Sequence, residues 1–216
     1  MRQSPTSRYA APLARASTWR ACWSLLAASW LALAFGTAAT AATFTFAGSH
    51  SSVTISWSHA GLSRHSARIV GVDGTLEFEP ADPQSATVEA RLDPARLSTG
   101  VPALDRLLRS PDFFDVASHP VIAFRSTAAR ITGERTGEVL GDLTVAGVTR
   151  PVALTVTWNF AGEHPLGLVN PSFAGKFVAG FSATTKILRS EWNLGRGAPL
   201  ISDEVDVAIE VEAVRR

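Results

Sequence analysis

Histidines are the side chains best suited to acid–base or metal chemistry in this 216-residue chain, which has five of them. Zinc sites need three or four ligands that converge on the ion. His59 and His65 are six residues apart in the polar stretch SHAGLSRHS, which we expect to form a loop, and this spacing does not fit one face of a helix. With no cysteine nearby, the pattern predicts no metal site. His59, at the end of a predicted strand, is expected to be a hydrogen-bonded structural residue or a polar contact for a ligand.

Familiar catalytic motifs are absent from the sequence. No serine lies in the G-x-S-x-G context of a nucleophile elbow, and no glycine-rich loop joins a predicted strand to a helix as phosphate binding requires. Asp112, Asp115, Asp203 and Glu204 are the candidates for a catalytic carboxylate pair, but nothing in the sequence brings them together. These patterns predict that the protein is not an enzyme and needs no cofactor.

An enzyme that acts on a lipid-like substrate is the catalytic alternative, and it would need a polar pair inside the fold. His59 with Ser56 or Ser58 is the available set. Because side chains alternate along a strand, both serines are expected on the face opposite Trp57.

Alternating apolar and polar residues dominate the chain after residue 42. This period of two is typical of antiparallel strands with one dry and one wet face; in one segment it places Phe160 on the same apolar face as Trp158. We predict about eight strands, at residues 53–58, 68–79, 86–92, 121–131, 138–145, 152–160, 177–183 and 205–211. So many strands in one domain favour an all-β fold, either a closed antiparallel barrel or a sandwich.

One stretch interrupts the β pattern between the third and fourth predicted strands. Three leucines in residues 104–108 recur at helical spacing, and Pro111 ends this helix because the residue before a proline avoids the α region. The adjacent rings of Phe113 and Phe114 follow. We expect this helical insertion to plug or cover one end of the β-structure; the alternative is that the two rings are simply core residues.

The predicted apolar faces mix large and small side chains. Trp57, Trp158, Phe177 and Phe181 share these faces with several alanines. Small residues leave room, and an eight-stranded barrel can hold a small ligand. Ordinary interdigitated packing would instead fill the core. The sequence therefore leaves both a hollow and a filled barrel open.

Residues 1–42 have the features of a cleaved secretory signal. Four arginines and no acidic residue precede the apolar run ACWSLLAASWLALAF, and Ala39-Thr40-Ala41 is an A-x-A cleavage site, with cleavage after Ala42 as the alternative. The apolar run is short for a membrane span, which needs about 20 residues. We therefore expect a secreted protein whose single domain is residues 43–216.

Removal of the signal changes the bulk properties of the chain. The signal contains four of the 20 basic residues and none of the 19 acidic ones, so its loss takes the net charge from +1 to −3. A mildly acidic domain without a basic run is a poor nucleic-acid binder. The single cysteine, Cys22, is also lost, so no disulfide is expected.

The segments together resemble the YceI-like family of secreted, lipocalin-like proteins. Nine segments match in the family's order, and the two most specific are LRSPDFFD at 108–115 and GDLTVAGVTRPV at 141–152. The resemblance implies an eight-stranded antiparallel barrel that encloses a long apolar molecule, a polyisoprenoid or a fatty amide in relatives, without catalysis. This sequence departs from the family at Ala146, where a histidine is common, and at Ala67-Arg68-Ile69, where Gly-x-Phe is common.

With this resemblance, the sequence predicts a periplasmic carrier that holds a polyisoprenoid, an isoprenoid quinone or a fatty-acyl amide inside the barrel. The alternative is a filled barrel that serves as a structural or interaction module, for instance as the partner of a membrane redox protein. Transient membrane contact and a homodimer that pairs two exposed mouths are further expectations. The expected polar contacts for a head group are His59, Arg189 and Ser190. The expected lining residues are Val53, Ile55, Trp57, Phe113, Phe114, Phe124, Val156, Trp158, Phe177 and Phe181.

Overall fold

The computed structural model of this chain describes residues 41–216. The predicted secretory signal lies outside these residues except for its last two. Ala42, the last of them, begins the first strand and pairs with Phe78.

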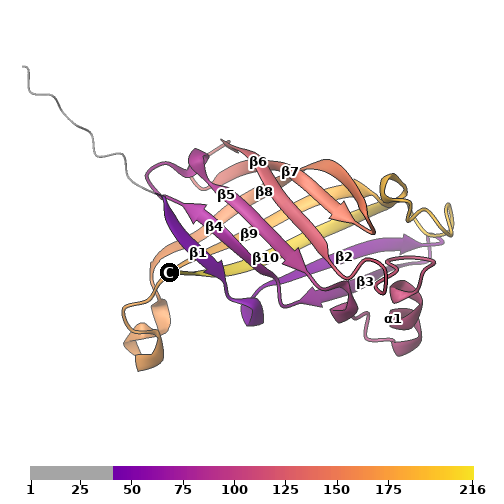
Figure 1. Ribbon diagram of the computed structural model, residues 1–216, viewed down its shortest axis with the longest axis horizontal. Helices are drawn as coiled ribbons and strands as arrows, with labels where there is room; N and C mark the ends of the chain where they lie inside the picture. Colours follow the sequence, from indigo (N-terminus) through magenta and orange to yellow (C-terminus); the bar gives the residue numbers. More distant parts are fainter. Residues whose placement is uncertain (1–40) are drawn as a thin grey trace, which may run out of the picture. The chain divides into compact units, whose positions relative to one another are not determined.

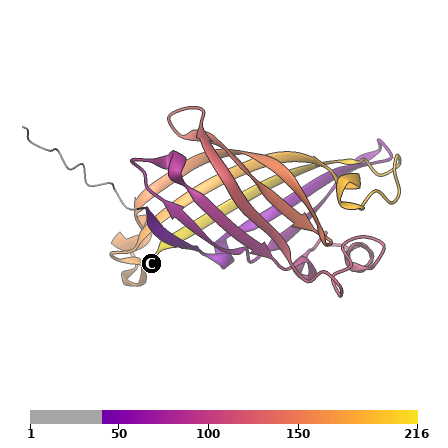
Figure 2. The same cartoon turned by 45° about the horizontal axis from the view of Figure 1, so that its top comes forward.

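Ten strands within the described residues form one antiparallel sheet that closes on itself, as Figures 1 and 2 show. Hydrogen-bonded neighbours follow the order β1-β4-β5-β6-β7-β8-β9-β10-β2-β3, and β1 also pairs with β10. The strands are β1 (Ala42–Phe46), β2 (Ser52–His59), β3 (Ser63–Val70), β4 (Asp73–Phe78), β5 (Thr87–Leu92), β6 (Ile122–Ile131), β7 (Thr136–Val145), β8 (Val148–Glu163), β9 (Phe177–Leu188) and β10 (Glu204–Arg215). The short 3-10 helices are η1 (Gly48–His50), η2 (Pro83–Ser85), η3 (Pro94–Arg96), η4 (Pro165–Leu168), η5 (Pro171–Phe173) and η6 (Arg189–Trp192).

The ten strands occupy eight positions around the barrel, because two of these positions are each filled by two shorter strands. β10 pairs with β2 through residues 206–210 and with β1 through residues 213–215, so β1 and β2 are two parts of one strand with η1 between them. β3 and β4 are two parts of the next strand, and Gly71, whose φ is 78°, lies at the break. The closed eight-stranded antiparallel barrel expected from the sequence is therefore confirmed.

The insertion between β5 and β6 carries the helix α1 (Pro102–Arg109). Pro102 begins this helix, at a position where its missing N–H would have no helical partner. The Asp105 carboxylate ties the helix to the preceding loop, because it accepts hydrogen bonds from the backbone N and the Oγ1 of Thr99, both at 2.6 Å. In the count of eight strands, β5 and β6 are the third and fourth, as expected. Among the described helices, none has the length and apolar character needed to cross a bilayer.

Two local features differ from the expectations. The stretch SHAGLSRHS is mostly strand rather than loop, because Ala67 and Ile69 are buried on the inner side of β3 and His65 shares that side. In β8, the register shifts between Trp158 and Phe160. This bulge turns Phe160 outward, where 39% of it is exposed, so its expected place on the inner face is wrong.

Buried apolar residues form two clusters inside the barrel. The larger one includes Trp57, Leu97, Leu108 and Trp192, so it joins the insertion to the barrel wall. The smaller one is built on Phe44 of β1 with four other buried residues of β4, β9 and β10. The two clusters leave open space between the walls, and that space is the candidate site.

Candidate functional site

A cavity of about 650 Å³ lies inside the barrel. All ten strands contribute to its wall, together with α1 and the loops at that end. Alternate residues of a strand share one face, so β2 supplies every second side chain to the wall, among them Val53, Ile55 and Trp57. The wall is mostly aliphatic and aromatic. Open space of this size argues against the filled-barrel alternative.

Nine of the ten predicted lining residues lie on the cavity wall. They are Val53, Ile55, Trp57, Phe113, Phe114, Phe124, Val156, Trp158 and Phe181. The tenth, Phe177, is not on this wall: its ring packs against Phe44 with 6.2 Å between centroids, and the Arg215 guanidinium lies 5.8 Å from the centroid of the Phe177 ring. That these side chains contact a ligand stays a prediction.

Aromatic rings line the cavity at the end away from α1. Phe78 meets Trp158 edge-to-face at 5.2 Å between centroids and meets Phe181 in the same way at 5.3 Å. The Arg135 guanidinium lies 5.8 Å from the Trp158 ring centroid. The indole Nε1 of Trp158 is buried without a hydrogen-bond partner in the described part of the protein. This end therefore offers stacking surface beside charged residues of the β6–β7 hairpin, which include Arg130, Glu134, Arg135 and Glu138.

The α1 insertion covers the opposite end of the cavity. Three leucines of α1 and the rings of Phe113 and Phe114 line the cavity there. Leu107 lines the cavity and is also 45% exposed to solvent. We call this end of the cavity, between α1 and the loop before β10, the mouth. Asp112, which follows α1, forms an ion pair with Arg196 from the loop between η6 and β10. This pair connects the two sides of the mouth.

Two histidines line the cavity close to this mouth. The rings of His59 and His65 are 5.1 Å apart between centroids, and His65 stacks on Trp57 at 6.1 Å. His59 also forms a β-bridge with Ile201 of the loop that precedes β10. Within residues 41–216, no group of three or more His, Cys, Asp or Glu side chains could hold a metal ion. The two imidazoles thus supply polar contacts in a mainly apolar wall.

Arg189 lines the cavity, but its guanidinium is occupied by the protein itself. Its Nε and both Nη atoms donate to the backbone carbonyl oxygens of residues 194, 196, 201 and 202. Burial lowers the pKa of this guanidinium, and the nearby Asp203 carboxylate acts in the opposite direction. Arg189 therefore holds the loop between η6 and β10 in shape, and few of its donors face the cavity.

Ser190 is not part of the cavity wall. Its backbone N and its Oγ donate to the Asp203 carboxylate at 2.8 and 2.6 Å. The hydroxyl hydrogen bond lowers the pKa of Asp203. Of the three predicted head-group contacts, the structure therefore places His59 and Arg189 on the wall and Ser190 outside it.

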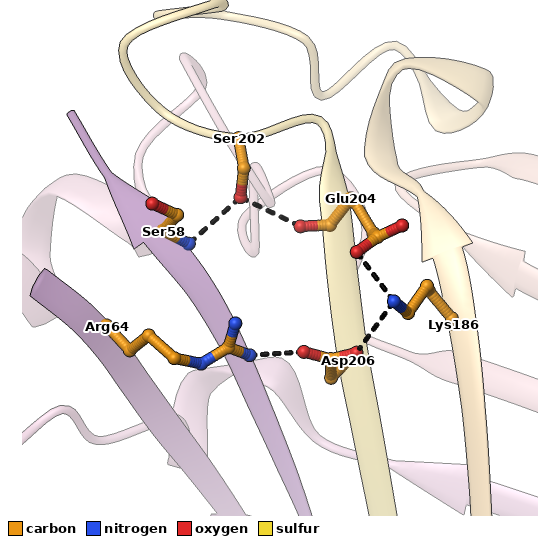
Figure 3. Close-up of polar contacts among 6 residues, drawn as sticks. All are labelled: Ser58, Arg64, Lys186, Ser202, Glu204 and Asp206. Atoms are coloured by element: carbon orange, nitrogen blue, oxygen red, sulfur yellow. Dashed lines mark hydrogen bonds and ion pairs between the residues drawn. The ribbon is translucent and has the colours of Figure 1, made fainter. Parts of the chain in front are cut away.

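Polar contacts on the outer wall hold the mouth together (Figure 3). Ser202 Oγ accepts a hydrogen bond from the Ser58 backbone N at 2.9 Å and donates to the Glu204 carbonyl oxygen at 2.8 Å. Lys186 Nζ lies 2.7 Å from a Glu204 carboxylate oxygen and 3.6 Å from one of Asp206, which also pairs with Arg64. Strands β2, β3, β9 and β10 are thus linked just outside the mouth.

Some lining residues were missed by the sequence reasoning. Trp192 is 1% exposed, lines the cavity and donates its Nε1–H to the Leu143 carbonyl oxygen at 3.2 Å. A large aromatic residue in the otherwise polar stretch after β9 was the available signal. The leucines of α1 were assigned to a helix but not to the lining, although their shared face had to cover something apolar.

The fold and the cavity together define the class of this protein: it is a lipocalin-like barrel, closed and antiparallel around an apolar interior. A sequence model of the YceI-like domain matches residues 44–213. The chain belongs to the YceI-like family, as the resemblance in its sequence indicated.

Relatives of known sequence cover most of the chain. A UPF0312 protein of Pseudomonas savastanoi pv. phaseolicola is 34% identical over 200 residues, which are 89% of this chain and 100% of that protein. A UPF0312 protein of Azotobacter vinelandii is 32% identical over 169 residues, which are 78% of this chain and 84% of that protein.

Solved structures share the fold. Burkholderia cenocepacia BcnA superposes with a TM-score of 0.65 at 21% identity, over 75% of this chain and 95% of that one. A polyisoprenoid-binding domain from Saccharophagus degradans, implicated in plant cell wall breakdown, has a TM-score of 0.60 at 13% identity, over 82% of this chain and 99% of that domain. At these identities the likeness concerns the fold alone.

Proposed function

We propose that this protein is exported by a cleaved N-terminal signal and works in the periplasm as a non-enzymatic carrier of a long apolar lipid. The ligand lies inside the barrel, with its chain along the aliphatic and aromatic wall. The single observation that carries this proposal is the apolar cavity of about 650 Å³. The polyisoprenoid-binding domain of the same fold supports it.

The ligand class follows from the energetics of burial. Each CH₂ group that leaves water contributes about 0.8 kcal/mol, so ten of them contribute about 8 kcal/mol. Association costs roughly 4–15 kcal/mol in lost freedom of motion. A short acyl chain would therefore bind weakly, and a longer prenyl or acyl chain is needed for stable retention. Polyisoprenoids, isoprenoid quinones and fatty-acyl amides meet this requirement.

Native mass spectrometry tests the proposal directly. We expect protein purified from the periplasm without detergent to carry one added mass at near-stoichiometric occupancy, and organic extraction to yield a prenyl or acyl compound of that mass. A mass equal to that of the unliganded protein, unchanged after incubation with prenyl lipids and quinones, would contradict the proposal.

A matched pair of variants links the bound mass to the cavity. Phe181→Glu places a carboxylate on the cavity wall and should abolish lipid retention, because a buried charge without a partner opposes an apolar ligand. Phe160→Glu makes the same change on the outer surface and should retain the lipid. Circular dichroism checks that both variants fold. Retention by a folded Phe181→Glu protein would show that the lining assignment is wrong.

A further inference from the structure

Three leucines at the α1 end of the barrel are exposed despite their apolar side chains. Leu62 is 85% exposed, Leu200 is 68% exposed and Leu107 is 45% exposed. They come from the β2–β3 turn, the loop before β10 and α1, three segments that lie at the same end of the barrel in Figures 1 and 2. We call these three side chains the leucine rim. Single exposed leucines are common on proteins, so their position carries the argument.

The leucine rim is continuous with the cavity wall. Leu107 itself lines the cavity. Leu62 and Leu200 flank His59 and Ile201, which also line it and which form a β-bridge with each other. The leucine rim therefore adjoins the cavity wall at this end of the barrel.

The backbone that presents Leu62 and Leu200 is fixed. The Ala60 backbone N donates to the Leu200 carbonyl oxygen, which joins the β2–β3 turn to the loop before β10. Ser202 continues this link through its contacts with Ser58 and Glu204, as Figure 3 shows. Neither leucine is folded back into the core, and both extend from an ordered backbone into solvent.

We propose that the leucine rim docks on a phospholipid bilayer and that the lipid cargo enters the barrel there. This inference rests on the proposed lipid-carrier function. A long apolar chain resides in a bilayer, and passage through water would expose each of its methylene groups. Docking by the rim would join the acyl region of the bilayer to the cavity without an intervening aqueous gap.

The chemistry of the rim fits a lipid surface. Its leucines are exposed apolar side chains at one end of the barrel, and side chains of this kind insert at the boundary between head groups and acyl chains. Arg64 and Arg196 lie two and four residues from Leu62 and Leu200, and each forms an ion pair within the protein, with Asp206 and with Asp112. The apolar side chains, and not a free cation, therefore carry the preference of the rim for a lipid surface.

The test compares apolar losses at the two ends of the barrel in the mature protein. The rim variant is Leu62→Ser/Leu200→Ser. The control is Leu168→Ser/Val169→Ser, which changes side chains that are 96% and 79% exposed in the η4 segment at the opposite end. Binding is measured by co-sedimentation with phosphatidylethanolamine–phosphatidylglycerol vesicles, and loading by the rate at which fluorescent geranylgeraniol leaves those vesicles.

We expect the rim variant to reduce vesicle binding and the loading rate by about ten-fold and the control to change both by less than about two-fold. An equal effect of both variants, or a larger effect of the control, would overturn the proposal. So would a stable wild-type dimer that the rim variant converts to a monomer, because a second copy would then cover the rim.

Uptake of the same probe from detergent micelles separates this inference from the carrier function. We expect the rim variant to bind the probe from micelles with wild-type stoichiometry, because its cavity is unchanged. If the wild-type protein takes up no probe from micelles, both the carrier function and the docking proposal fail. If it loads from micelles but never binds vesicles, the docking proposal alone fails.

Discussion

Replacement of Ala183 by leucine tests whether a ligand occupies the middle of the barrel. Ala183 lies on β9 between Val156 of β8 and Ile209 of β10, and all three side chains line the cavity. Leucine adds three carbon atoms that point into open space. At about 0.8 kcal/mol per methylene, their burial gains up to about 2.4 kcal/mol. After the loss of rotamer freedom, we expect the free energy of unfolding of the ligand-free protein to rise by about 1–2 kcal/mol.

The affinity for the lipid should change in the opposite direction. The larger side chain takes space that the lipid chain would fill, so the lipid buries about three fewer methylene groups. This loss of about 2.4 kcal/mol in binding free energy corresponds to a rise in Kd of roughly 50-fold. Urea denaturation of the delipidated protein measures the stability, and titration with a fluorescent prenol measures the Kd. Ala153→Leu, on the exposed side of β8, is the control and should leave both quantities unchanged.

The opposite signs make this experiment decisive. Ordinary core packing would give a loss of stability of about 1–3 kcal/mol from the larger side chain, with no effect on a ligand bound elsewhere. A folded Ala183→Leu protein that is less stable and binds the lipid with wild-type Kd would refute the reasoning, because the middle of the barrel would then be filled by protein and not by ligand.

Three further predictions concern the scaffold. In Gly141→Ala the new Cβ would overlap the Phe124 ring, so urea denaturation should show a loss of about 1–3 kcal/mol; an unchanged midpoint would contradict the tight packing. Hydrogen bonds from Thr99 lower the pKa of Asp105 below its usual value of 3.8. The Asp105 carboxylate therefore stabilises the fold above pH 3.8, and this contribution is lost as the pH falls through the pKa of the folded state. Asp105→Asn should remove this acid-dependent part of the urea midpoint. A variant with the same dependence of the midpoint on pH as the wild type would contradict the prediction. Arg196→Ala removes an exposed ion pair, so the free energy of unfolding should change by less than about 1 kcal/mol while stopped-flow fluorescence shows faster lipid release; unchanged release would mean that the pair does not restrain the mouth.

The strands were predictable from sequence because a half-buried strand repeats every two residues. In β2, Val53, Ile55 and Trp57 alternate with small polar residues, and all three line the cavity. The same rule failed at Phe160, because a bulge after Trp158 adds one residue and reverses the alternation. No composition signal marks this bulge, since it depends on the pairing of β8 with β9.

The polar part of the site was less predictable than the apolar part. Arg189 was expected near a head group because it is a cation beside an apolar run. In the structure its donors are used by backbone carbonyls of the following loop, which the chain brings back over the guanidinium. A sequence shows which donors exist, but their acceptors depend on how a loop closes, and this loop is closed by Ser202 and the start of β10.

The sheet is incomplete at the α1 end because the second strand of the barrel is interrupted. After Gly71 the second strand continues as β4 and pairs with β5, whereas β3 meets the insertion through a bridge between Arg68 and Ser98. The sheet therefore does not close over the α1 end with its own ladder, and the helix α1 covers that end with apolar side chains instead. Side-chain contacts can separate at a lower cost than a ladder of backbone hydrogen bonds in a closed sheet, because no buried N–H or C=O group is left without a partner. Entry of the proposed lipid is therefore expected where a helix and a loop meet, and this is where the leucine rim lies.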